Sequence, residues 1–367
     1  MHQLEDQPDG GRAVMTAPPV PTGPVAGITS VEDLRAHLQW AIEVEHTTIP
    51  SYLCALYTVD EDRNPEAAEV LHSVLLEEML HLALAANLLN AVGGHPELDS
   101  PRLLPGYPRT LPHRDPPLPI SLLPFGPESL DLFLQIERPC APDAAPQADA
   151  YATIGQFYDA IRRGFVDLVA ACGDTAVFNG DPARQIADKE FRGGPGRIFR
   201  VTDLPTALAA LDLIVDQGEG AAHVEVWDGD HDMFHPERDA VGHYYRFLQL
   251  RLGRRYRRGD TPASGPTGGP VRVDWSAVRP MARDARVADH PPGSPVRRAM
   301  DDVNGIYCRV LELLEATFNG RPDQLGPAIA TMFRLKESAG SLLRMQVDGT
   351  GTTAGPSFEY VLPEDRP

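Results

Sequence analysis

Three glutamates occupy positions on apolar helical stripes where a core side chain is expected: Glu45, Glu78 and Glu219. His81 follows Glu78 by three residues, so it lies one turn later on the same helix face. An isolated carboxylate buried among Leu and Val side chains costs several kcal/mol and would rather protonate than stay charged. A divalent metal ion removes that cost, and carboxylates combined with imidazole suit iron, manganese or zinc. These four residues are therefore candidate metal ligands.

The spacing of Glu78 and His81 has a known use. A Glu-x-x-His motif on one helix, with a Glu from a facing helix, holds paired iron or manganese ions in four-helix bundles of the ferritin-like type. Glu77 competes with Glu78, because a phase error of one residue in the helix would exchange the two glutamates. His243 lies on one apolar stripe, but a second stripe through Tyr244 is equally good. The pattern leaves His243 open as a ligand or as a structural histidine.

Apolar side chains recur at spacings of three and four along most of the chain, which predicts an all-α fold. The first helix begins at Ser30, whose spacing to Asp33 suits a capping box. Asn64 caps the second helix, and Gly93 ends it. The other expected helices are 128–137, 150–171, 203–223, 239–256, one that Ser294 caps, and 324–345. No strand pattern exceeds four or five residues, and the best candidates are 197–201 and 222–227.

Proline and glycine gather between the expected helices. The chain has 36 prolines and 32 glycines, and thirteen of the prolines lie between residues 95 and 146. Regular helices do not tolerate this density of proline, so we expect 95–149 to be a Pro-rich excursion inserted into a helical bundle. The predicted organisation is a flexible tail at 1–27, a metal-binding bundle at 28–258, and C-terminal helices at 259–361 that pack on the bundle.

Charge and composition exclude several classes of protein. The chain of 367 residues has 33 Lys and Arg against 52 Asp and Glu, a net charge of −19, and its one dense basic run is 251–258. A nucleic-acid partner is therefore not expected. No apolar run reaches the length of a membrane span, and the N-terminus does not read as a signal peptide. The four cysteines lie far apart in the sequence, which argues against a disulfide framework. We expect a cytoplasmic protein without a membrane partner.

Several segments together resemble a known family. They include Glu-Met-Leu-His-Leu at 78–82, Gln-Gly-Glu-Gly at 217–220 and His-Tyr-Tyr-Arg-Phe at 243–247. The segments 41–57, 87–94, 136–139, 154–158 and 354–360 extend the likeness over roughly 28–361. The chain is similar to the ferritin-like domain of the iminophenyl-pyruvate dimer synthase family, which is related to enzymes of violacein, rebeccamycin and staurosporine biosynthesis.

The resemblance implies a ferritin-like four-helix bundle with a metal site, and oxidative chemistry on amino-acid-derived imines. The metal ligands that it implies are Glu45, Glu78, His81, Glu219 and His243. The family pattern expects Glu-x-x-His in the last bundle helix, but this chain has Ala-Val-Gly-His at 240–243. Either Asp239 or His223 compensates for the missing glutamate, or the second metal position is weakened.

Three function classes follow from these observations. The first is a non-haem metal-dependent oxidoreductase that acts on a small, amino-acid-derived substrate in natural-product metabolism. Its cofactor would be one or two non-haem iron ions, with manganese or zinc as alternatives, and its partners would be biosynthetic enzymes and further copies of the chain. The second class is an iron-binding, ferroxidase-type protein without an organic substrate. The third is a metal-free scaffold with protonated or paired stripe carboxylates.

Overall fold

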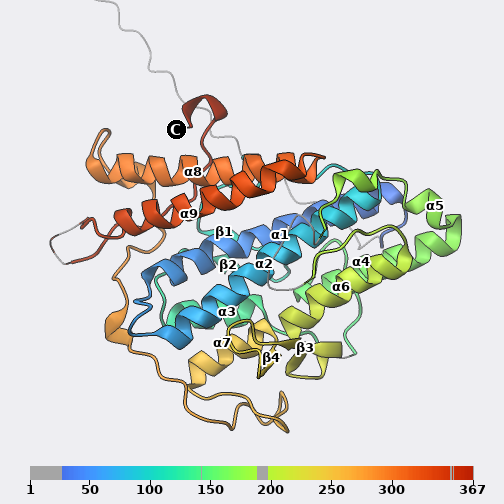
Figure 1. Ribbon diagram of the computed structural model, residues 1–367, viewed down its shortest axis with the longest axis horizontal. Coiled ribbons are helices and arrows are strands. Elements are labelled where there is room, and N and C mark those ends of the chain that lie inside the picture. Colours follow the sequence, from blue (N-terminus) through green and yellow to red (C-terminus); the bar gives the residue numbers. More distant parts are fainter. Residues whose placement is uncertain (1–26, 142, 188–196, 348, 350, 367) are drawn as a thin grey trace, which may run out of the picture.

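Four helices pack side by side as a bundle: α1 (Val31–Thr58), α2 (Pro65–Ala91), α4 (Ile154–Cys172) and α6 (Leu204–Glu219). Helix α2 contacts α1 and α6, and α4 contacts the same two helices. The four therefore form a bundle in which α1 lies diagonally across from α6 and α2 from α4; Figure 1 shows α1 beside α2 and α4 beside α6. The computed structural model describes residues 27–141, 143–187, 197–347, 349 and 351–366. All but the last residue of the predicted tail at 1–27 lies outside these residues. The predicted all-α class is confirmed.

The first helix starts as its sequence predicts. Ser30 accepts a hydrogen bond from the Asp33 amide at 3.0 Å, and the Asp33 carboxylate accepts one from the Ser30 amide at 3.0 Å. This reciprocal capping box satisfies two amides that have no partner inside the helix. The stripe that follows, with Leu34, Leu38 and Ala41, is completely buried. Burial of this face fixes the rotation of α1, which in turn sets the direction of its polar side chains.

Helix α2 lies at the centre of the molecule. By length and composition alone, the helix could cross a membrane. However, 89% of its most apolar stretch of 18 residues is buried inside the protein. It packs against α1, α6, α7 and α8, so most of its apolar side chains are buried. An apolar composition on all faces of a helix is typical of a helix in the core of a large domain.

A second layer closes one side of the bundle. It contains α3 (Pro127–Ile136) and α7 (His243–Leu252), which pack against each other, and an antiparallel pair of β3 (Trp227–His231) and β4 (Asp239–Val241). Helix α3 is the short helix expected within the Pro-rich excursion, which also holds the two-residue strands β1 (Arg109–Thr110) and β2 (Pro119–Ile120).

The boundaries of two predicted helices differ from the expectation. The helix expected at 239–256 begins only at His243, because residues 239–241 pair with β3 as strand β4. The helix expected at 203–223 ends at Glu219, because Gly220 adopts φ 88°, which does not continue a right-handed helix. Strand β3 begins at 227, where the expected strand 222–227 ends, and 197–201 forms no strand.

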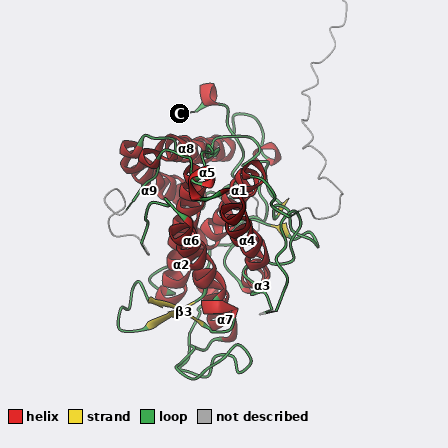
Figure 2. Cartoon of the chain, turned by 90° about the vertical axis from the view of Figure 1, so that its right-hand side faces the viewer, coloured by secondary structure: helices red, strands yellow, loops and turns green. Residues whose placement is uncertain are grey.

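An outer layer covers the opposite side of the bundle. It consists of α8 (Pro295–Phe318), which Ser294 caps as predicted, and α9 (Leu325–Leu342). Figure 2 shows this layer at one end of the view and α7 with β3 at the other, with the bundle between them. The remaining short elements are α5 (Asp174–Val177) and the 3-10 turns Pro182–Arg184, Ala221–His223, Trp275–Ala277, Val287–Asp289, Pro322–Gln324 and Pro363–Asp365.

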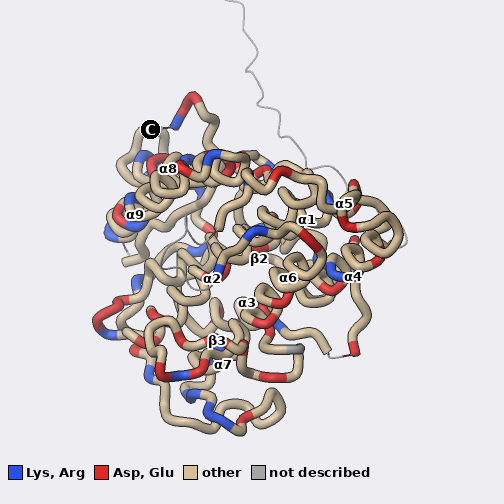
Figure 3. The backbone as a smooth tube through the Cα atoms, turned by 45° about the vertical axis from the view of Figure 1, so that its right-hand side comes forward, with Lys and Arg blue, Asp and Glu red and all other residues tan. Residues whose placement is uncertain are grey.

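The dense basic run at 251–258 forms ion pairs with acidic residues of the same chain. Figure 3 shows basic and acidic residues interspersed along the tube. Arg251 pairs with Asp131 at 2.6 Å, and Arg255 pairs with Glu66 at 3.0 Å. These pairs join the run, which begins in the last turn of α7, to α3 and to the start of α2.

Candidate metal centre

Helices α1 and α2 bring three of the predicted ligands together. Glu45, Glu78 and His81 are buried. The Nδ1 atom of His81 lies 3.6 Å from Oε2 of Glu45 and 3.8 Å from Oε1 of Glu78. The hydroxyl of Thr48, which is also on α1, donates a hydrogen bond of 2.7 Å to Oε2 of Glu78. The stripe positions that the sequence indicates therefore lie in one buried cluster between the two helices.

His243 joins this cluster from the first residue of α7. Its Nδ1 atom lies 2.9 Å from Oε1 of Glu78. The rings of His81 and His243 stack with their centroids 5.3 Å apart. The candidate ligand atoms of Glu78, His81 and His243 all lie within 4.8 Å of one another. Of the two interpretations left open for His243, the structure favours membership of the cluster.

Glu137 is the member of the cluster that sequence reasoning missed. It is buried directly after the last residue of α3, and its Oε2 atom lies 3.7 Å from Nδ1 of His243. The hydroxyl of Tyr52 donates a hydrogen bond to its other oxygen. Because Glu137 ends a short helix inside the Pro-rich excursion, no helical stripe points to it. Its one signal is its place in the segment 136–139, which belongs to the resemblance.

Glu219 does not enter the cluster. Its Oε1 atom accepts a hydrogen bond of 2.8 Å from the amide of Gly155, and its Oε2 atom accepts one of 2.9 Å from the amide of Cys140. The Nδ1 atom of His223 lies 2.9 Å from the same Oε2. Both carboxylate oxygens are therefore engaged by groups outside the cluster. Candidate ligand atoms of Cys140, Glu219 and His223 form a second, separate group within 4.8 Å.

The two residues considered as possible replacements for the glutamate missing at Ala240 do not reach the cluster. Asp239 belongs to β4, and its carboxylate pairs with Arg258 at 2.6 Å. His223 is held between Glu219 and Asp159, whose Oδ2 atom lies 3.7 Å from its Nε2. Because residues 239–241 are a strand, position 240 is not one helical turn before His243. Glu137 takes up the space beside His243 instead.

The hydrogen-bond partners of His81 fix which ring nitrogen faces the cluster. The Nε2 atom of Gln217 lies 3.0 Å from a carboxylate oxygen of Asp230. A carboxylate only accepts, so the amide nitrogen of Gln217 faces Asp230 and its oxygen faces His81. That oxygen lies 2.9 Å from Nε2 of His81, which therefore donates. In a neutral ring the lone pair of Nδ1 then faces Glu45 and Glu78.

A parallel arrangement orients His243. Its Nε2 atom lies 2.9 Å from Oε2 of Glu77, so it donates to that carboxylate. Arg246 holds the same oxygen at 2.8 Å and pairs with Asp228 at 2.9 Å. Glu77 is therefore neither a solvated neighbour nor a member of the inner cluster. The Nδ1 atom of His243 has no hydrogen-bond partner among the described residues, and it points toward Glu78.

The charges of the cluster do not balance by themselves. Burial, and next the negative charge of Glu137, raise the pKa of Glu78 to about 7. Burial disfavours a charged His243, but the carboxylates of Glu137, Glu77 and Glu78 around its ring outweigh this and raise its pKa well above the ordinary value. The carboxylates thus attract a positive charge into this space, either protons or a metal ion. Two inward imidazole nitrogens among carboxylates fit a first-row transition metal.

The space beside the cluster is small. A cavity of about 20 Å³ is lined by Glu45, Glu78, His81 and Glu137, by Gly155 and Tyr158 of α4, and by Gly218 and Glu219 of α6. This volume holds roughly one water molecule. The hydroxyl of Tyr158 donates to Glu45. The second pair of bundle helices therefore supplies the wall of the site and hydrogen-bond partners for its members.

Comparisons with known proteins agree with this architecture. A solved structure of a ferritin-like protein from Caulobacter vibrioides superimposes with a TM-score of 0.62 at 24% identity, covering 90% of this chain and all of that one. Dichlorochromopyrrolate synthase of Lentzea aerocolonigenes is 29% identical over 331 residues, covering 78% of this chain and 29% of the synthase. The 2-imino-3-(indol-3-yl)propanoate dimerase of Chromobacterium violaceum is 28% identical over 240 residues, covering 58% of this chain and 23% of the dimerase.

This chain thus spans less than a third of the length of either curated relative. The predicted resemblance to enzymes of the violacein and rebeccamycin type is confirmed at this level. The model of the Ferritin-like family matches residues 38–252, which include most of the bundle, α3 and α7. With four bundle helices and a Glu-x-x-His motif at their centre, the chain belongs to the Ferritin-like family.

Proposed function

We propose that this chain is a metal-dependent oxidoreductase that acts on a small, amino-acid-derived imine. The observation that carries the proposal is the pair of inward Nδ1 atoms of His81 and His243, both directed at Glu78. Glu45 would complete one metal position with His81, and Glu137 the other with His243, with Glu78 between them. Bound iron or manganese would supply electron transfer to dioxygen, and zinc would not.

Other side chains have supporting roles in this proposal. Glu77 and Gln217 hold the Nε2–H groups of the two histidines, which keeps Nδ1 of each ring directed inward. The hydroxyls of Tyr52 and Tyr158 fix Glu137 and Glu45. The narrow cavity keeps bulk water away from the carboxylates, which strengthens their attraction for a cation.

The substrate class is proposed from the relatives, whose names refer to an imino acid dimerase and a dichlorochromopyrrolate synthase. Oxidative coupling of two imino acids breaks two bonds to hydrogen, forms one carbon–carbon bond and releases two electrons and two protons. Dioxygen would take these up and become hydrogen peroxide. The reaction therefore needs air but no separate reductant.

An aerobic assay tests the proposal. An amino-acid oxidase with L-tryptophan would generate the imino acid in place, with catalase to remove the peroxide formed in that step. We expect the iron-loaded chain to add a coupled product, detected by mass spectrometry, and Glu78→Gln to form none above the level without the chain. Equal product with the wild type, with Glu78→Gln and without the chain would refute the proposal.

The small cavity favours a second candidate, an iron-binding protein without an organic substrate, because an amino-acid-derived molecule does not fit in about 20 Å³. Aerobic loading with Fe(II) separates the two. An enzyme would hold iron at one or two ions per chain, whereas an iron-handling protein would oxidise many equivalents of Fe(II) without imine turnover.

A further inference from the structure

A large cavity in the described part of the chain lies away from the candidate metal centre. It has a volume of about 870 Å³ and lies between α1 and α2 on one side and α8 and α9 on the other. This is within the range of pockets that bury small organic molecules. Few residues of α8 or α9 contact the bundle helices directly, so the outer layer leaves this space open.

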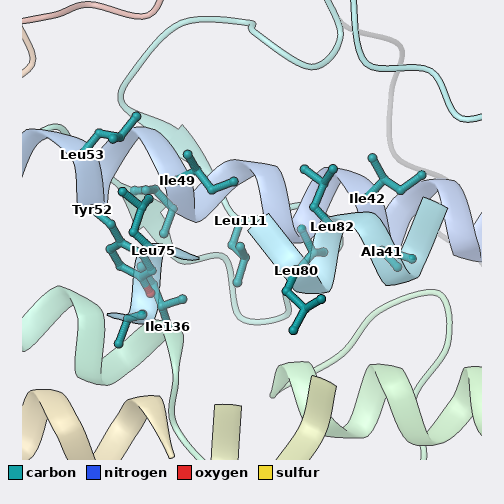
Figure 4. Close-up of a cluster of buried hydrophobic side chains, with 14 of the residues drawn as sticks. Ala41, Ile42, Ile49, Tyr52, Leu53, Leu75, Leu80, Leu82, Leu111 and Ile136 are labelled. Atoms are coloured by element: carbon teal, nitrogen blue, oxygen red, sulfur yellow. The ribbon is translucent and has the colours of Figure 1, made fainter. Parts of the chain in front are cut away.

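The cavity and the metal centre use opposite sides of the same two helices. Figure 4 shows Ile49, Leu53 and Leu82 directed to one side of the α1 and α2 pair, and Tyr52 directed to the other, beside Ile136. Ile49, Leu53 and Leu82 line the cavity, whereas Tyr52 donates to Glu137 in the cluster. A molecule in the cavity is therefore separated from the centre by the two helices.

One buried polar group in the cavity wall lacks a partner. His46 lines the cavity and is only 1% exposed. Its Nε2 atom lies 2.9 Å from the hydroxyl of Tyr307, but its Nδ1 atom has no hydrogen-bond partner among the described residues. A buried polar atom without a partner costs about 1–3 kcal/mol. A ligand with a hydroxyl group would serve this nitrogen in either tautomer of the ring, since a hydroxyl both donates and accepts.

The remaining wall defines the rest of the ligand. Apolar and aromatic side chains dominate it, including Tyr57, Phe318 and Phe333. Lys336 and Glu61, which belong to the wall, bond each other at 2.9 Å, and both side chains are more than half exposed. Phe333 is 69% exposed. Glu69, which also belongs to the wall, pairs with His235 at 3.1 Å. An uncharged ring system matches this lining, because a charge in the interior would lose its hydration while these carboxylates and the lysine are already paired.

We propose that this cavity is a second small-molecule site, which takes an uncharged, ring-containing molecule with one hydroxyl group that meets Nδ1 of His46. The site is independent of the proposed oxidation chemistry. Its occupancy would stabilise the contact between the outer layer and the bundle, since α8 and α9 would gain apolar neighbours on that side.

Two probes that differ in one group test the site on the full chain: 2-naphthol and naphthalene, titrated by their fluorescence. We expect saturable binding of one molecule per chain, with 2-naphthol bound about fivefold more tightly. His46→Leu is expected to abolish this preference while naphthalene still binds and metal content is unchanged. Absence of saturable binding, or equal affinity of the wild type for both probes, would overturn the proposal.

Blocking variants locate the binding. Leu314→Trp in α8 and Met332→Trp in α9 each place an indole in the cavity, and we expect either to weaken binding of both probes at least tenfold. Val166→Trp, on the exposed surface of α4, is the matched control and should bind as the wild type does. Unchanged binding in a folded Leu314→Trp or Met332→Trp variant contradicts the proposal. A dimer would also contradict it: if sedimentation velocity shows that the wild type is a dimer and that Phe333→Asp is a monomer, a second copy of the chain covers the cavity.

Discussion

The Nδ1 atom of His243 lies 2.9 Å from Oε1 of Glu78, although the two residues are 165 positions apart and come from different layers of the fold. Both side chains are buried. The opposite nitrogen of the ring donates to Glu77, which Arg246 holds in place. The ring orientation is thus fixed from outside the cluster, and Nδ1 faces the carboxylates of Glu78 and Glu137. A positive charge between these two atoms stabilises the arrangement.

Substitution of the central carboxylate tests this relationship. In Glu78→Gln the amide oxygen keeps the contact with Thr48, and one negative charge is removed from a crowded site. We expect the chelated variant to melt a few degrees above the chelated wild type, since about 1 kcal/mol shifts the melting temperature of a large domain by roughly 2–4 °C. The same variant should retain no tightly bound metal. A variant that keeps full metal content would contradict the central role of Glu78.

Metal removal gives the complementary measurement. Binding to the folded state alone contributes RT ln(1 + [L]/Kd), about 4 kcal/mol at a thousandfold excess over Kd. We expect chelation to lower the melting temperature of the wild type and added Fe(II) or Mn(II) to restore it. His81→Ala should show neither change. An equal melting temperature with chelator and with metal would argue for the metal-free scaffold.

The sequence is most informative where the candidate ligands lie on long helices. Glu45, Glu78 and His81 interrupt apolar stripes, so their burial follows from the spacing of the neighbouring apolar residues. Glu219 interrupts a stripe too, but it is the last residue of α6, and there its carboxylate accepts backbone amides of other segments. A stripe indicates burial and does not identify the partner.

Glu137 could not be predicted in the same way. It follows a helix of ten residues, and its position depends on how the excursion 95–149 folds back over the bundle. Such a path is set by contacts distant in sequence and leaves no periodic pattern. The start of α7 differs from the prediction for a related reason, because the pairing of β4 with β3 overrides the local helical pattern at 239–241.

Matched substitutions separate Glu137 from Glu219. We expect Glu137→Gln to lower metal affinity at least tenfold, because it removes the carboxylate beside His243. Glu219→Gln should leave metal content unchanged and lower the free energy of unfolding by about 1–3 kcal/mol, because it weakens hydrogen bonds to two amides and His223. The reverse outcome, in which Glu219→Gln loses metal without loss of stability, would restore Glu219 as a ligand.

Substitutions in β4 test whether the residue at position 240 affects metal binding at the candidate centre. Asp239 pairs with Arg258, and Ala240 lies in a strand, so neither side chain is part of the cluster. We expect metal titrations of Asp239→Ala and Ala240→Glu to give the same number of ions and the same affinities as the wild type. A new tight site in Ala240→Glu would show instead that the second metal position is incomplete for want of that glutamate.

The last prediction concerns two glycines in the wall of the small cavity. A Cβ atom on Gly155 would stand 2.5 Å from Oε1 of Glu219, whereas one on Gly218 would have its nearest neighbour, Oε2 of Glu137, at 4.0 Å. Glu219 is buried and held by two backbone amides, so it has little room to move. We therefore expect Gly155→Ala to cost about 1–3 kcal/mol of unfolding free energy, as overpacking does. Gly218→Ala lies inside α6 and should be neutral or stabilise the protein by up to about 1 kcal/mol through helix propensity. Urea denaturation of both variants in the presence of chelator measures this difference without a contribution from metal. Equal stabilities would mean that Glu219 can leave its amide partners at no cost, and the wall of the site would then be mobile enough to admit a substrate.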